Sequence, residues 1–120
     1  MSYPNLTLCW KDFETNAPYT FQQLWTNKDL ADVTLVTGDD QQMRAHKIIL
    51  SSSSPFFKNI FIRKPHQNPL LYLKDINYKF LELVIQFIYT GKCDVDQLDL
   101  VEFLSAGKYL EVTGLLRDLV

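Results

Sequence analysis

DVTLVTGDDQQMRAHKIILSSSSPFFKNIF, residues 32–61, is the stretch that decides the fold. Apolar and polar residues alternate on both sides of a Gly-Asp-Asp turn at residues 38–40, which predicts a β-hairpin. An apolar run then leads into four consecutive serines and Pro55, after which apolar residues recur at helical spacing. Because serine caps helix N-termini and proline is tolerated in a first turn, the pattern predicts two short helices with a break at the serines. We expect Ser53 or Ser54 to be the N-cap and Pro55 the first helical residue.

The segment before the hairpin combines a short strand-like run, residues 6–10, with a helical period of apolar residues. The helix is predicted to begin near Thr15, because Pro18 then falls in the first turn, where its missing N–H matters little. The strand-like run stands alone, and a single strand needs the edge of another strand to satisfy its backbone.

Large aromatic residues are concentrated in this front segment. They are Trp10, Phe13, Tyr19, Phe21 and Trp25. Together they exceed what one face of a small domain can bury, and exposed apolar surface of this extent usually means a partner. The alternative is that these residues complete the core of their own chain.

The second half of the chain is predicted to be mainly helical. Its expected elements are a brief buried strand at residues 70–73, a helix whose apolar residues run from Phe80 to Ile88, a further helix whose apolar residues run from Leu98 to Leu110, and a last helix over residues 113–119. Asp75 or Asn77 is expected to cap the first of these helices, and Gly91 to end it in the left-handed conformation. Asp96 is expected to cap the next helix.

These elements together resemble the BTB/POZ domain family. The residues that carry the resemblance are Asp32, Ala45, His46, Lys47, Ile49, Leu50, Ser51, Ser54, Pro55, Phe56, Phe57 and the segments 73–76, 87–91, 106–110 and 114–115. The N-terminal run ending in Trp10, with Pro65 and Pro69, looks most like the insect tramtrack-type group of transcription and chromatin factors. The resemblance implies an α+β fold, with a small mixed sheet and about five to six helices. It also implies that residues 1–120 form one domain, the N-terminal module of a longer protein.

The resemblance further implies an obligate homodimer. In this family the first helix lies on a two-fold axis, and the N-terminal strand is exchanged with the other subunit, which buries the front segment isologously. The residues implied at this interface are Leu6, Leu8, Trp10, Phe13, Phe21, Leu24 and Trp25. Asp32 and Lys47 are implied to form a charged pocket at the interface, with a purely structural salt bridge or cap as the alternative. Tramtrack-type dimers also assemble further through their N-terminal strands, so an oligomer of dimers is expected.

Two functions follow from the resemblance. The first is the oligomerisation module of a nuclear transcription or chromatin factor, whose DNA-binding domain would lie beyond Val120. Its partners would be a second copy, related BTB domains, and corepressor or chromatin proteins. The alternative is a cullin ubiquitin-ligase substrate adaptor. Adaptors of that kind carry a hydrophobic-x-Glu motif after the second short helix, and residues 61–64 here read Phe-Ile-Arg-Lys.

The composition agrees with a single non-catalytic domain. The chain has 120 residues, of which 47% are hydrophobic, and a formal charge of −2 with lysine and arginine scattered along it, so direct contact with nucleic acid is not expected. No apolar run is long enough to predict a membrane span. Two cysteines, Cys9 and Cys93, are too few for a disulfide framework and are expected to be free thiols in a cytosolic or nuclear setting.

Enzymatic chemistry is not indicated by any motif. The four glycines form no phosphate-binding arrangement, and no serine lies in a Gly-x-Ser-x-Gly elbow. Neither His46 nor His66 has Cys or a carboxylate at metal-ligand spacing, so no metal or other cofactor is expected. We interpret His46 as a histidine satisfied by local backbone and packing, with a pH switch or a ligand role as the alternatives. Asp39 and Asp40 are interpreted as a solvated turn.

Overall fold

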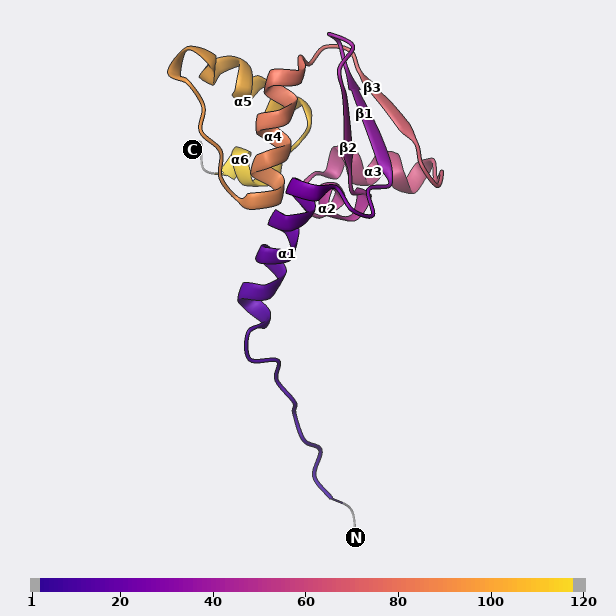
Figure 1. The fold of residues 1–120 in the computed structure, drawn as a ribbon, viewed down its shortest axis with the longest axis vertical. Helices are drawn as coiled ribbons and strands as arrows, with labels where there is room; N and C mark the ends of the chain where they lie inside the picture. Colours follow the sequence, from indigo (N-terminus) through magenta and orange to yellow (C-terminus); the bar gives the residue numbers. More distant parts are fainter. Residues whose placement is uncertain (1–2, 118–120) are drawn as a thin grey trace.

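The computed structural model describes residues 3–117. In chain order its elements are α1 (Phe13–Asn27), β1 (Val33–Thr37), β2 (Gln42–Ala45), α2 (Lys47–Ser53), α3 (Pro55–Arg63), β3 (Leu70–Leu73), α4 (Tyr78–Thr90), η1 (Gln97–Asp99), α5 (Leu100–Tyr109) and α6 (Thr113–Arg117). A small sheet and a group of helices form the body, and α1 projects from it with an extended N-terminal segment (Figure 1). The longest dimension is consequently 67 Å, against 34 and 27 Å for the other two.

The sheet is mixed and has the strand order β2-β1-β3. β1 and β2 form the predicted antiparallel hairpin, with Val33 opposite Ala45, and β3 pairs parallel to β1. Alternation along β1 places Val33 and Leu35 in the core. The α+β class expected from the sequence is therefore confirmed.

The helix break at the serines depends on Ser54. Its Oγ accepts a hydrogen bond from the Phe57 N–H at 3.1 Å and donates one to the Leu110 C=O at 2.6 Å. Pro55 begins α3 as predicted, and of the two candidate caps the structure selects Ser54. One buried hydroxyl thus caps α3 and ties it to the end of α5.

Asp39 and Asp40 lie in an exposed turn, as predicted, but Asp39 has a further role that the sequence did not indicate. Its carboxylate accepts a hydrogen bond from the Tyr78 N–H at 3.0 Å, at the start of α4, and another from the Thr37 hydroxyl. Asn77 precedes α4 but makes no side-chain cap bond. The hairpin turn therefore caps a helix that lies 39 residues further along the chain. The hydrogen bond from Thr37 is the main reason that the pKa of the Asp39 carboxyl lies below its ordinary value.

The predicted cap of α4 by Asp75 or Asn77 was wrong, because Asp39 accepts the N–H at the start of that helix. Two other predicted signals at the ends of the later elements are confirmed. Gly91 ends α4 with a left-handed φ of 81°, and Asp96 accepts the Leu98 N–H at 3.0 Å at the start of η1. The last helix is described as Thr113–Arg117, so its predicted end at Leu119 lies outside the described residues.

The core is built around α4, which contributes five buried residues. They are Phe80, Leu81, Val84, Ile85 and Tyr89. α1 and α5 both contact this helix. α1 is the exception among the longer helices, because none of its residues is fully buried.

Replacing Ser54 with alanine should lower the free energy of unfolding by about 2–4 kcal/mol. The change removes an N-cap and leaves a buried carbonyl without its donor. Urea denaturation at fixed protein concentration would measure the loss. Ser53→Ala is the matched control, since Ser53 caps no helix, and equal stability of the two variants would contradict the role of Ser54.

The contribution of the Asp39 charge should disappear in acid. A carboxyl whose pKa is depressed by folding stabilises the fold above its unfolded pKa, near 4, and that stabilisation is lost as the pH falls through the folded pKa. Asp39→Asn should therefore melt below the wild type at pH 7, and the difference should shrink below about pH 4. Asp40→Asn, one residue along the same turn, is the control. A gap that stays constant with pH would contradict the prediction.

Candidate protein-interaction surface

The N-terminal arm, residues 3–12, extends away from the body without regular structure (Figure 1). Its apolar side chains are in water: Leu6 is 84%, Leu8 91% and Trp10 63% exposed. The strand predicted at residues 6–10 is thus absent from the single chain. The physical reason is that no other described strand lies beside it, and an unpaired strand has nothing to hold its backbone in register.

α1 continues the arm, and its predicted start near Thr15 was wrong. The helix begins at Phe13, because the Asp12 C=O already accepts the N–H groups of Thr15 and Asn16. Pro18 therefore lies inside the helix rather than in its first turn. Proline has no N–H, so it donates no intrahelical hydrogen bond to the Glu14 carbonyl. Because this part of the helix is exposed, water satisfies that carbonyl instead.

The outer half of α1 adds further exposed aromatic surface. Phe13, Tyr19 and Phe21 are all exposed, and the Phe13 ring lies 5.4 Å from that of Trp10. Arm and helix therefore form one continuous apolar surface. Five of the seven predicted interface residues lie on it. They are Leu6, Leu8, Trp10, Phe13 and Phe21.

The other two predicted interface residues, Leu24 and Trp25, are half-buried against the core of their own chain. The Trp25 ring lies 5.5 Å from that of Tyr89. The Lys28 ammonium lies 3.7 Å from the centre of the Trp25 ring, a cation–π arrangement, and burial lowers the pKa of this lysine. The inner end of α1 therefore packs against α4.

His46 and Tyr89 form a buried hydrogen-bonded unit next to this contact between α1 and α4. The Tyr89 hydroxyl accepts the His46 backbone N–H at 2.9 Å and donates to Nδ1 of the same residue at 2.6 Å. Nε2 of His46 donates to the Asp29 carbonyl at 2.6 Å. Both ring nitrogens are therefore satisfied within the fold, as predicted, but by a tyrosine side chain and a carbonyl distant in sequence rather than by local backbone. Burial raises the pKa of Tyr89.

Asp32 and Lys47 come together, but through the backbone of the lysine. The Asp32 carboxylate accepts the Lys47 N–H at 2.8 Å, which caps the start of α2. The Lys47 ammonium instead donates to the His66 carbonyl. Within residues 3–117 the ion pair that does form is Lys79–Asp99, at 2.7 Å. The contact between Asp32 and Lys47 is thus the structural cap, and their role in an interface pocket stays a prediction.

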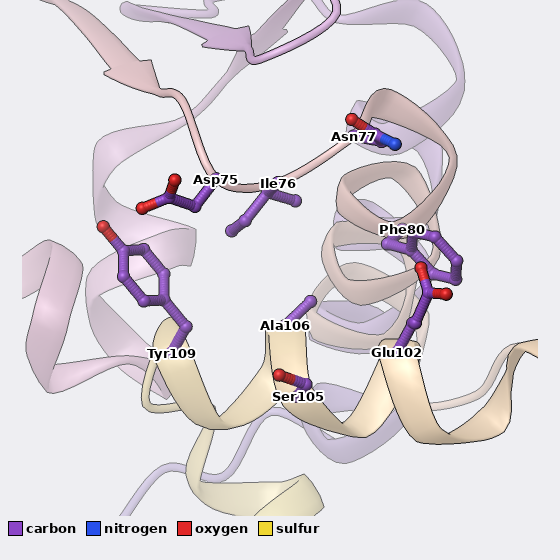
Figure 2. A pocket seen from close by; sticks show the side chains of 8 residues that line it. All are labelled: Asp75, Ile76, Asn77, Phe80, Glu102, Ser105, Ala106 and Tyr109. Atoms are coloured by element: carbon purple, nitrogen blue, oxygen red, sulfur yellow. The ribbon is translucent and has the colours of Figure 1, made fainter.

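A small pocket of about 240 Å³ lies between the start of α4 and α5. Figure 2 shows that Tyr109 and Glu102 come from α5, and that Asp75, Ile76 and Phe80 face them across the gap. Two carboxylates and apolar walls line it, at a volume below the usual range for ligand pockets. In the described part of the chain no group of His, Cys, Asp and Glu is arranged to hold a metal ion, and no helix is long and apolar enough to cross a membrane.

The fold and this surface can be compared with known proteins. The chain matches the BTB/POZ domain family over residues 21–119. It is 39% identical over 108 residues to Longitudinals lacking protein-like of Drosophila melanogaster, covering 90% of this chain and 84% of that protein. Against Protein tramtrack, alpha isoform, of the same organism, identity is 34% over 115 residues, covering 96% of this chain and 14% of that protein. The chain belongs to the BTB/POZ domain family.

Family membership confirms the resemblance drawn from the sequence and supports a protein-interaction module as the role of the domain. A further relative, Protein bric-a-brac 1 of Drosophila melanogaster, is 35% identical over 108 residues, which is 90% of this chain and 11% of that protein. The chain thus spans most of one relative and a small share of the other two. The family match begins at Phe21, so the arm and the outer part of α1 precede it.

Removing the Tyr89 hydroxyl should destabilise the domain. Tyr89→Phe keeps the ring against Trp25 but leaves the buried His46 N–H without its acceptor, which should cost about 2 kcal/mol or more. Chemical denaturation would measure this cost, with Tyr109→Phe, whose ring is half-exposed, as the matched control. Unchanged stability of the Tyr89 variant would contradict the importance of this unit.

Proposed function

We propose that this chain is a homodimerisation module, and that the observation carrying the proposal is the uncovered apolar surface of the arm and α1. A folded body of adequate size is present, yet it leaves five large apolar side chains in water. Burying a fully exposed side chain of this size contributes about 1.5–3 kcal/mol, and Leu6 and Leu8 come closest to that case. A second copy offers the same surface in return, so one isologous contact covers both.

Strand exchange is the arrangement that also satisfies the backbone of the arm. In a strand, alternate side chains share a face, so Leu6, Leu8 and Trp10 would point to one side and Thr7 and Cys9 to the other. An arm paired with the sheet of the partner would gain ladder hydrogen bonds and place its apolar face on the partner. The inner residues Leu24 and Trp25 would then join the interface only through the part of their surface that their own chain leaves exposed.

Asp32 and Lys47 would lie beside this interface. Asp32 lies in the link between α1 and β1, and its carboxylate already accepts the backbone N–H of Lys47. In the dimer we expect the charged groups of these two side chains to face the partner as well. They would then set its orientation more than its affinity.

We propose further that the module serves a nuclear transcription regulator or chromatin factor. The support is the likeness to tramtrack and bric-a-brac 1, which the chain matches over 14% and 11% of their lengths. Residues 1–120 would form a single domain at the N-terminus of such a protein. Related BTB domains, corepressors or chromatin proteins would be its partners, and DNA contact would belong to another domain.

The first test is the mass of the protein in solution. Sedimentation or light scattering at micromolar concentration should give a dimer or a multiple of it. Leu6→Asp with Leu8→Asp should weaken association at least tenfold, because each charge would have to be buried in an apolar contact. Both positions are exposed, so the fold should be unaffected.

Leu98→Asp is the matched control, since Leu98 is a leucine of equal exposure on η1. Deleting residues 1–10 should reduce any species larger than a dimer to the dimer or below. A folded wild-type monomer at micromolar concentration would overturn the proposal.

A further inference from the structure

Charge is distributed unevenly along this chain. Residues 41–74 contain six of the twelve lysines and arginines and no aspartate or glutamate, so this segment carries a formal charge of +6. The rest of the chain holds the other six and all fourteen acidic residues, a formal −8. The overall charge of −2 conceals this separation.

The structure concentrates part of the basic segment in one groove. This basic groove, of about 530 Å³, lies between the end of α3 and the start of β3. Its lining residues are Asn59, Ile60, Phe61, Arg63, Lys64, His66, Pro69, Leu70 and Leu71. The floor is mainly apolar, the three titratable lining residues are all basic, and no carboxylate lines it. The Lys47 ammonium holds the adjoining loop through the His66 carbonyl.

The groove borders the outer edge of the sheet. β3 is the last strand in the order β2-β1-β3, and Leu70 and Tyr72 on it are 60% and 57% exposed. The Pro69 C=O accepts the Thr34 N–H at 3.0 Å, so Pro69 and Leu71 direct their backbone toward β1. Leu70 and Tyr72 therefore direct their N–H and C=O groups outward, where no described strand receives them.

We propose that the basic groove and the β3 edge together bind an extended acidic segment of a partner protein. Such a segment would add to β3 as a strand, with one or two apolar side chains on the groove floor and carboxylates on Arg63 and Lys64. Uncharged or basic segments would lack the contact between carboxylates and the side chains of Arg63 and Lys64. A nucleic acid would satisfy the basic residues, but its phosphate backbone offers nothing to the apolar floor or to outward N–H and C=O groups.

The lining residues of this site are distinct from the arm and α1, which form the proposed dimer surface. None of the lining residues belongs to the arm or α1, and β3 contacts β1 while α1 contacts α4. One domain could therefore hold its second copy on one side and an acidic partner on another.

The test uses the full chain and labelled peptides of defined composition. The first probe alternates glutamate with leucine or valine over ten residues, and the second has lysine in place of glutamate. Fluorescence anisotropy should show binding of the acidic probe alone, weakening as salt is added. Arg63→Glu with Lys64→Glu should weaken it about tenfold or more, whereas Lys92→Glu with Lys108→Glu, the same charge change elsewhere, should not.

Backbone pairing is tested on the peptide, which leaves the protein intact. N-methylation of alternate residues along one edge of the acidic probe should abolish binding, and methylation along the other edge should preserve it. Equal binding of the two methylated probes would overturn strand addition. Equal binding of the acidic and basic probes would overturn the charge assignment.

Two further outcomes would also overturn the proposal. One is tighter binding of single-stranded oligothymidylate that is lost in the Arg63 and Lys64 variant. The other is a change in oligomer mass in that variant without any peptide binding, which would assign the groove to a second copy. Failure of dimerisation would show in the mass of the wild type instead, so the two proposals fail separately.

Discussion

The hydroxyl of Tyr89 joins three segments that are far apart in the sequence. It bonds to the backbone and the ring of His46, and that ring in turn bonds to the Asp29 carbonyl. The end of α4, the start of α2 and the link from α1 to β1 are thereby fixed to one buried point. Trp25 packs on the same tyrosine ring. The direction in which α1 and the arm leave the body therefore depends on this unit.

That direction separates two kinds of surface. The arm and the outer part of α1 present apolar side chains to water, and the groove beside β3 presents basic ones on an apolar floor. Apolar surface gains most from a self-complementary partner, since both copies lose their exposed area together. A basic groove at a strand edge selects by charge and by backbone pairing instead. The fold thus provides for two associations that obey different rules.

Signals within a few residues of one another were readable from the sequence. The hairpin, the cap at Ser54 and the left-handed Gly91 all follow from local chemistry, and each is confirmed. The cap from Asp39 to Tyr78 was missed, because it joins residues that come together only after the sheet and α4 have packed. A turn aspartate gives no local sign of which helix it will cap.

The surface features, too, could be predicted from the sequence only in part. An excess of aromatic residues in the front segment was visible in the sequence, but the division between the exposed Phe13 and the seated Trp25 depends on where α1 meets α4. The spacing of lysine and arginine along the chain does not predict the basic groove, because the groove forms only where the end of α3 meets the start of β3. The lack of any acidic residue between positions 41 and 74 was the available signal.

The two tryptophans of the chain occupy very different surroundings. Trp10 lies in water on the arm, whereas the Trp25 indole is enclosed by Tyr89 and the Lys28 ammonium. The polarity around an indole governs the wavelength of its fluorescence emission. The molecule therefore carries two built-in optical reporters: one follows the fate of the arm, and the other follows the integrity of the body.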